Sequence, residues 1–309
     1  MDIKIENLTR NYGSQKAVDN ISFEVRTGEI IGFLGPNGAG KTTTMKMITN
    51  YISVGEGDIL IGGKSVKTHA DALKKHIGYL PENNPLYHDM GMIDYLEFCA
   101  ALQGVRKEKI GERVRKMIRI CGLNVEKHKK IGELSKGYRQ RVGLAQSMIH
   151  DPEILILDEP TTGLDPNQIV EIRKLIRELG QEKTVILSTH ILPEVEATCD
   201  RILIINKGKL VADGTAEHLR KQSKGQEMLK VKIEEGEANT IFTALQQLSS
   251  VALVDFADRQ HCRFELQSNP GVSSKHEVFK LCVEKGWILS EMIPVETRLE
   301  DIFRDLTIN

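Results

Sequence analysis

Gly35-Pro36-Asn37-Gly38-Ala39-Gly40-Lys41-Thr42 fits the pattern G-x-x-x-x-G-K-[ST] of a phosphate-binding loop. The mostly apolar run 29–34 before it predicts a buried parallel strand, and the pattern of 41–51 after it predicts a helix. Glycines let the backbone wrap closely, so that successive N–H groups and the helix start face phosphate oxygens. A glycine-rich turn that binds nothing is the alternative, which the flanking strand and helix disfavour. We expect contacts from this stretch and Thr43, with Lys41 reaching the β- and γ-phosphates and Thr42 ligating Mg²⁺.

Two acidic residues, Asp158 and Glu159, end the aliphatic run 154–157. Four aliphatics in a row predict a fully buried parallel strand, and open α/β sheets bind ligands at the carboxyl ends of such strands. Unpaired acids in that position would be costly, so Mg²⁺ and a water molecule are natural partners. We expect Asp158 to hold the metal through water and Glu159 to orient or deprotonate the attacking water.

His190 follows the next predicted buried strand, 185–188. A lone histidine is usually packed or exposed without a special role. This one shares a sheet edge with the phosphate loop and the acid pair, which favours a contact with the γ-phosphate.

A third candidate region begins a helix that runs to about His150. Ser135 is placed as its N-cap, and Lys136 and Gly137 follow in the first turn. A capped helix start is often purely structural, but its N–H groups and positive dipole end also suit an anion.

An antiparallel layer is predicted from two alternating segments, 3–8 and 21–25, with Tyr12 in the turn between them. An aromatic residue in a turn often only packs on the surface. Because Tyr12 precedes the phosphate loop, it is also a candidate platform for a purine base, since base–aromatic stacking is worth about 1–3 kcal/mol.

The chain of 309 residues is long enough for about two domains. We predict a first domain over 1–220, with a helical lobe at about 83–150 inserted between its strands, and a second over 226–309. The excess of lysine and arginine in the lobe is interpreted mostly as a solvated face. In the second domain the order β-α-β-β-α-β predicts a ferredoxin-like fold. Its last helix would be capped by Thr297 and Glu300, and its expected role is regulation or binding to another protein.

Leu86 and Tyr87 lie in an Asn-Pro loop at the start of the predicted helical lobe. A solvated loop is one interpretation. The apolar side chains slightly favour the other, a docking surface for a partner.

Composition excludes several classes of protein. A net charge of −1 argues against a general nucleic-acid or anionic-membrane surface. No apolar run approaches the roughly 18 residues of a membrane span, and the N-terminus lacks a signal-peptide pattern. The scattered cysteines are interpreted as reduced core thiols of a cytosolic protein. They are Cys99, Cys121, Cys199, Cys262 and Cys282.

Together these motifs resemble the ATP-binding subunit of ATP-binding-cassette (ABC) transporters over about residues 1–214. The resemblance implies one role for each motif. In family terms Tyr12 stacks on adenine, Gly35 to Thr42 is the Walker A loop, and Glu82 holds the metal-binding Q-loop position. Ser135 to Tyr138 is the signature, and Asp165 is the D-loop. Asp158 is the Walker B aspartate, Glu159 is the catalytic glutamate, and His190 is the H-loop.

The resemblance also implies a fold and partners. The fold would be a P-loop NTPase of the α/β class with a mixed sheet, an antiparallel β layer and a helical lobe. ATP with Mg²⁺ would be bound between two copies arranged head to tail. The chain would lie on the cytoplasmic face of the inner membrane and drive a separate integral membrane permease. No nucleic-acid partner is expected.

Two positions depart from the usual family pattern. The signature is usually Leu-Ser-Gly-Gly-Gln, but Lys136 and Tyr138 stand here in place of a glycine and the glutamine. Glu82 stands where glutamine is usual. These substitutions and the ending 299–303 resemble the exporter branch that includes daunorubicin-type and gliding-motility (GldA-like) ATPases.

Two other functions remain open. One is a soluble ABC-type ATPase that acts mechanically on another macromolecule or on the ribosome. Such relatives typically carry two cassettes or long coiled-coil insertions, which this sequence lacks. The other is a nucleotide switch that does not hydrolyse ATP, against which Glu159 and His190 both argue.

Overall fold

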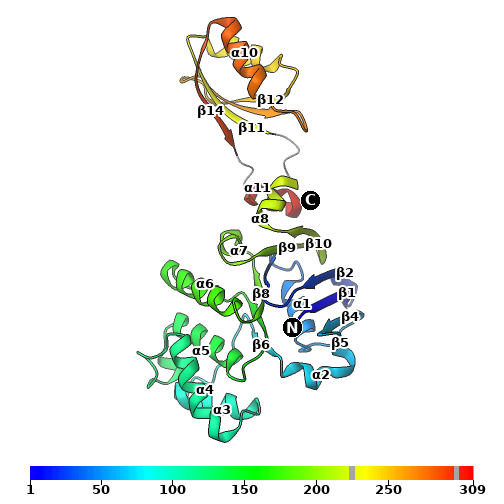
Figure 1. Cartoon of the computed structure of the whole chain (residues 1–309), viewed down its shortest axis with the longest axis vertical. Coiled ribbons are helices and arrows are strands. Elements are labelled where there is room, and N and C mark those ends of the chain that lie inside the picture. The colour runs from blue at the N-terminus through cyan, green and yellow to red at the C-terminus, as the bar shows by residue number, and fades with distance from the viewer. Residues whose placement is uncertain (223–226, 296–298, 309) are drawn as a thin grey trace. The chain divides into compact units, whose positions relative to one another are not determined.

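The computed structural model describes residues 1–222, 227–295 and 299–308. The chain divides into two units, Met1–Thr215 and Ala216–Asn309. The second unit begins at Ala216, within the last residues of the range 1–220 predicted for the first domain. Each unit is described by itself, and Figure 1 labels their elements.

A mixed sheet of six strands organises the first unit, in the order β10-β9-β3-β8-β7-β6. Five of the strands run parallel, and only β10 is antiparallel to its neighbour. The strands are β3 (Ile30–Leu34), β6 (Ile77–Leu80), β7 (Ile154–Asp158), β8 (Thr184–Thr189), β9 (Arg201–Asn206) and β10 (Lys209–Gly214). The mixed sheet that the resemblance implies is therefore confirmed, and the apolar runs predicted as buried parallel strands lie in it.

Aliphatic side chains bury both faces of this sheet, which explains the unbroken apolar runs. On one face Leu155 and Leu157 pack with the helical lobe and with α6 (Pro166–Gly180). On the other face Ile154 and Ile156 pack with α1 (Lys41–Ile48) and the antiparallel layer. Helix α1 ends three residues earlier than predicted, because Asn50 takes a left-handed φ of 50° that ends the helix.

The antiparallel layer has the order β2-β1-β4-β5. Its strands are β1 (Ile3–Tyr12), β2 (Gln15–Val25), β4 (Glu56–Ile61) and β5 (Lys64–Ser65), and α2 (Val66–Lys74) follows. The hairpin of β1 and β2 extends further than the alternation predicts. Register shifts between Ile5 and Asn11 interrupt the alternation without ending the pairing. Tyr12 therefore ends a strand rather than lying in a loop.

The inserted lobe is helical, as predicted. It contains α3 (Met92–Leu102), α4 (Lys107–Ile120), a 3₁₀ turn (Ile131–Glu133) and α5 (Lys136–Met148). The predicted N-cap is observed, since the Ser135 hydroxyl accepts a hydrogen bond from the Tyr138 N–H at 3.3 Å.

One expectation for the loop before α3 is wrong. Leu86 is only 8% exposed and belongs to the core that the lobe shares with the sheet. Its neighbour Tyr87 is 54% exposed, as the docking interpretation requires. The loop folds back onto the lobe, so its leucine is a core residue and only its tyrosine faces outward.

The second unit contains a four-stranded antiparallel sheet of order β12-β13-β11-β14. Its elements are α8 (Ala216–Gln222), β11 (Met228–Glu234), α9 (Ala238–Gln246), β12 (Val251–Asp258), β13 (Arg263–Ser268), α10 (Lys275–Lys285), β14 (Ile288–Val295) and α11 (Leu299–Ile308). The order β-α-β-β-α-β and this strand arrangement are ferredoxin-like, as predicted. Helix α8 contacts α11. Thr297 of the predicted capping box lies outside the described residues.

Two further observations bear on function. None of the helices in the described part of the chain is long and apolar enough to cross a membrane. The cysteines are unpaired, and burial raises the pKa of the Cys121 thiol to about 12, so this thiol stays protonated and unreactive at neutral pH.

Candidate active site

The loop after β3 is closed tightly against its neighbours, and glycine is required at both of its ends. A Cβ atom on Gly35 would lie 2.4 Å from the Ile205 carbonyl oxygen. A Cβ atom on Gly40 would lie 2.3 Å from the Ala17 carbonyl oxygen, and Gly40 has a φ of 110° that side chains rarely adopt. The loop leads directly into α1, and the first N–H groups of this helix are free of partners within the helix and lie at the end of the loop.

Lys41, the first residue of α1, turns its side chain back into this loop. Its ammonium group donates hydrogen bonds to the carbonyl oxygens of Gly35 at 2.8 Å and Pro36 at 3.3 Å. The residue is only 6% exposed. A buried cation is thus fixed at the centre of a loop of backbone N–H groups, an arrangement that suits a polyphosphate.

Asp158 lies at the carboxyl end of β7, beside the start of α1. Its Oδ1 accepts hydrogen bonds from the hydroxyl groups of Thr42, at 3.2 Å, and Ser188. Its Oδ2 is buried and has no hydrogen-bond partner within the described residues. Burial raises the pKa of this carboxyl group, against the two hydroxyl donors, which lower it. An unsatisfied buried carboxylate oxygen next to a threonine hydroxyl fits a hard divalent cation such as Mg²⁺.

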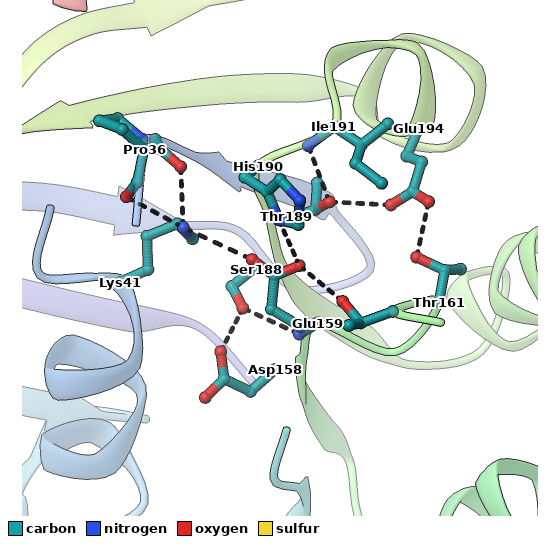
Figure 2. Close-up of polar contacts among 12 residues, drawn as sticks. Pro36, Lys41, Asp158, Glu159, Thr161, Ser188, Thr189, His190, Ile191 and Glu194 are labelled. Atoms are coloured by element: carbon teal, nitrogen blue, oxygen red, sulfur yellow. Dashed lines mark hydrogen bonds and ion pairs between the residues drawn. The ribbon is translucent and has the colours of Figure 1, made fainter. Parts of the chain in front are cut away.

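Glu159 follows Asp158 and has a strained backbone, with a left-handed φ of 50°. Its N–H donates to the backbone oxygen and the hydroxyl of Ser188, both at 3.1 Å. Its side chain contacts three groups, of which Figure 2 labels Lys41 and His190. Oε1 lies 3.4 Å from the Lys41 ammonium, and Oε2 lies 2.9 Å from His190 Nδ1 and accepts from the Thr162 hydroxyl at 3.1 Å.

The loop, Lys41 and Glu159 border a hollow with a volume of about 340 Å³. Asp158 does not line it but accepts a hydrogen bond from Thr42, which does. The lining of the hollow includes most of the predicted phosphate and metal residues, namely Asn37, Gly38, Gly40, Lys41, Thr42, Thr43, Glu82, Glu159 and His190. Ala17 and Thr162 also line it, and the sequence analysis missed both. Ala17 belongs to no motif, whereas Thr162 lies three residues after Glu159 in a turn and could have been suspected from that spacing.

Of the predicted residues outside the loop 35–43 and the acid pair, five do not line the hollow. Tyr12 is exposed at the end of β1, with the Arg10 guanidinium 5.4 Å from its ring centre. Ser135, Lys136 and Gly137 begin α5 in the lobe, and Asp165 is the N-cap of α6, where its carboxylate accepts from the Gln168 N–H at 2.9 Å. The start of α5 meets the start of α6, since a Cβ atom on Gly137 would lie 2.4 Å from Gln168 Oε1.

The comparisons with known proteins agree with this geometry. The model of the ABC transporter family matches residues 18–162, which include the phosphate loop, the lobe and the acid pair. The bacitracin transport ATP-binding protein BcrA of Bacillus licheniformis is 36% identical over 303 residues, which cover 97% of this chain and 95% of BcrA. The Nod factor export ATP-binding protein I of Cupriavidus metallidurans is 33% identical over 234 residues, or 74% of this chain and 76% of that protein.

A solved structure of an ATP-binding subunit of an ABC transporter has a TM-score of 0.66 and 28% identity, and it covers 72% of this chain and 94% of its own. The chain therefore belongs to the family of ATP-binding subunits of ABC transporters. It is an ABC-type ATPase, and the hollow is its candidate ATP site.

Substitution of Glu159 by glutamine tests the candidate general base. The amide keeps the size of the side chain but cannot take up a proton, so ATP turnover should fall by about 10²-fold or more. ATP affinity, measured by calorimetry, should stay close to that of the unchanged protein. Glu182→Gln, at an exposed glutamate before β8, is the matched control and should hydrolyse ATP normally. Near-normal turnover in Glu159→Gln would show that Glu159 is not the base.

Proposed function

We propose that this chain drives the export of a compound through a separate permease in the membrane, acting from the cytoplasmic face. The observation that carries the proposal is the convergence of Lys41, Glu159 and His190 on one hollow at the sheet edge. Support for transport comes from BcrA, which matches nearly the whole chain and is named for bacitracin transport. Support for the direction comes from a relative named for Nod factor export. The likeness to gliding-motility ATPases stays a prediction.

In this proposal the nucleotide phosphates lie on the loop 35–43, and Lys41 turns from the loop carbonyls toward the β- and γ-phosphates. Thr42 and Asp158 would hold Mg²⁺, with Glu82 as a further ligand. A bound Mg²⁺ would neutralise charge on the phosphate oxygens. Glu159 would orient the attacking water, and His190 would hold Glu159 in place through the contact at 2.9 Å.

A face for the permease is supported by exposed apolar side chains on the lobe. The ring of Tyr87 lies edge-on to Tyr95 and 5.9 Å from Phe98, so it is held in place although it is exposed. Phe98 and Leu102 are exposed on one face of α3. Next to them a hollow of about 480 Å³ is lined by Gln103 and by Tyr51, which is also exposed. Clustered exposed aromatic side chains such as Tyr87 and Phe98 are typical of a protein–protein interface.

A second copy of the chain would complete the ATP site. Ser135 and Gly137 lie outside the hollow in their own chain, at the capped start of α5. If they bind the γ-phosphate, as the family resemblance implies, they must do so from another copy. Lys136 and Asp165 would take part at the same junction.

Charge substitution at Tyr87 tests the permease face. The native complex is purified from its source in mild detergent, and the retained membrane proteins are identified. Tyr87→Asp should lose the retained permease and the transport that depends on it, because a charge replaces an apolar contact, while ATP binding stays intact. Val125→Asp, at another exposed apolar position on the lobe, is the control and should retain the permease. Unfolding of Tyr87→Asp, or retention of the permease by it, would contradict the assignment.

Mixing two inactive variants tests the shared site. Ser135→Arg lacks the signature contact and Lys41→Ala lacks the phosphate lysine, so neither variant alone should hydrolyse ATP. A mixed head-to-tail dimer places both changes in one site and leaves the other whole, so ATPase activity should partly return. Full activity of Ser135→Arg alone would exclude the signature helix. Heterodimers that form without any activity would show that the site lies within one chain or that both sites must be intact together.

A further inference from the structure

A buried carboxylate, Glu194, lies behind the candidate site and belongs to none of the motifs described above. It stands in the first turn of α7 (Leu192–Thr198) and is only 2% exposed. Its Oε1 accepts a hydrogen bond from the Thr161 hydroxyl at 2.6 Å, and its Oε2 accepts one from the Thr189 hydroxyl at 2.8 Å. Both threonines are buried as well.

The two threonines belong to the two segments that carry the candidate catalytic side chains. Thr161 lies two residues after Glu159, and Thr189 directly precedes His190. The hydroxyl of Thr189 also accepts the Ile191 N–H at 3.1 Å, which fixes the backbone on the other side of His190. Figure 2 shows the Glu194 carboxylate between the two hydroxyl groups, with the Glu159–His190 contact nearby. One side chain therefore joins the segment after β7 to the last residue of β8.

Helix α7, which carries Glu194, packs closely against the central sheet. Helix α7 lies so close to β3 that a Cβ atom on Gly32 would be 2.5 Å from Val195 Cγ1 and 2.9 Å from Cys199 Sγ. Only glycine at position 32 allows this approach, and β3 is the strand that leads into the phosphate loop. The carboxylate is thus fixed relative to the phosphate loop as well as to the two threonine segments.

Burying a carboxylate here has a free-energy cost that apolar side chains would avoid. Glu194 is only 2% exposed, and a buried carboxylate is costly in free energy unless its oxygens are hydrogen-bonded. Here each oxygen takes one hydroxyl hydrogen. Apolar residues at positions 161, 189 and 194 would fill the same space without this cost.

We propose that Glu194 is a positioning residue for ATP hydrolysis, which holds Glu159 and His190 in contact by joining the backbone segments from which they project. Glu159 needs such support, because its left-handed backbone persists only if the surroundings impose it. Thr161 is fixed by Glu194, and the next residue, Thr162, donates directly to Glu159 Oε2. Thr189 is fixed by the other oxygen, and His190 follows. This inference rests on the ATPase activity of the site and requires neither a permease nor a direction of transport.

Glu194→Ala is the main test, with the ATPase activity of the purified subunit measured at saturating ATP. It removes both acceptors, so the two segments lose their common anchor, and kcat should fall by about tenfold through misplacement of Glu159. The affinity for ATP should stay within about twofold, because Lys41 and the phosphate loop are held by other contacts. Glu194→Gln keeps the shape and one acceptor, and its amide can donate to the other hydroxyl, so it should recover most of kcat.

Two controls separate positioning from loss of stability. Val114→Ala removes buried packing from α4 of the lobe and leaves α7 and its contact with β3 unchanged, so it should lower the melting temperature while keeping kcat. In a Glu159→Gln background, single-turnover measurements should show that Glu194→Ala lowers the rate of ATP hydrolysis only slightly further. The reason is that Glu159, the residue that Glu194 positions, has already been replaced. If Glu194→Ala does not fold, Glu194→Asp gives the same test, since its shorter side chain cannot reach both hydroxyl groups.

Three outcomes would overturn the proposal. The first is an unchanged kcat in Glu194→Ala or Glu194→Asp. The second is a loss of ATP affinity as large as the loss of kcat. The third is that Glu194→Ala lowers the hydrolysis rate by the same factor in the Glu159→Gln background as in the unchanged protein. If instead Glu159→Gln itself retains turnover, the assignment of the base fails, and with it the role proposed for Glu194. If the proposed permease face is wrong, these ATPase measurements on the purified subunit stay the same. The two proposals are therefore tested independently.

Discussion

The parallel register of three strands determines where the chemistry of this protein can occur. Leu34 of β3 pairs with Thr189 of β8, and Ser188 of β8 pairs with Asp158 of β7. Segments far apart in the sequence therefore end together at one edge of the sheet. The phosphate loop, the acid pair and His190 are each the continuation of one of these strands, so a shift of the register would separate Lys41 from Glu159. Burial of aliphatic side chains on both faces of the sheet holds this register.

The elements that the sequence predicts well are those with a strong local signal. The runs 30–34, 154–157 and 185–187 contain no polar side chain, and the structure buries all of them in the central sheet. The predictions fail where a contact with a residue distant in sequence determines the end of an element or the burial of a side chain. Tyr12 ends a strand because a pairing with bulges continues after the alternation has stopped. Leu86 is a core residue because the loop folds back onto the lobe, and an apolar residue in an Asn-Pro sequence gives no sign of that return.

The same division applies to the candidate site. Motifs made of consecutive residues place Lys41, Thr42, Asp158 and Glu159 correctly at the sheet edge, because strand and loop together fix their direction. Thr161, Thr189 and Glu194 could not be found in this way. Each is an ordinary residue in its own segment, and they meet only because α7 packs against β3 at Gly32. Support for a catalytic geometry usually comes from such non-local contacts, which have no fixed spacing along the chain.

Counting the contacts of Glu159 shows how the site can serve as a base. A carboxylate offers about four acceptor positions on its two oxygens. Oε2 uses two of them for the His190 ring and the Thr162 hydroxyl, and Oε1 faces the Lys41 ammonium. One position on Oε1 is therefore left for the hydrogen of a water molecule. In the proposed function this position would accept the hydrogen of the attacking water, because Oε1 is the oxygen that lies 3.4 Å from Lys41 of the phosphate loop.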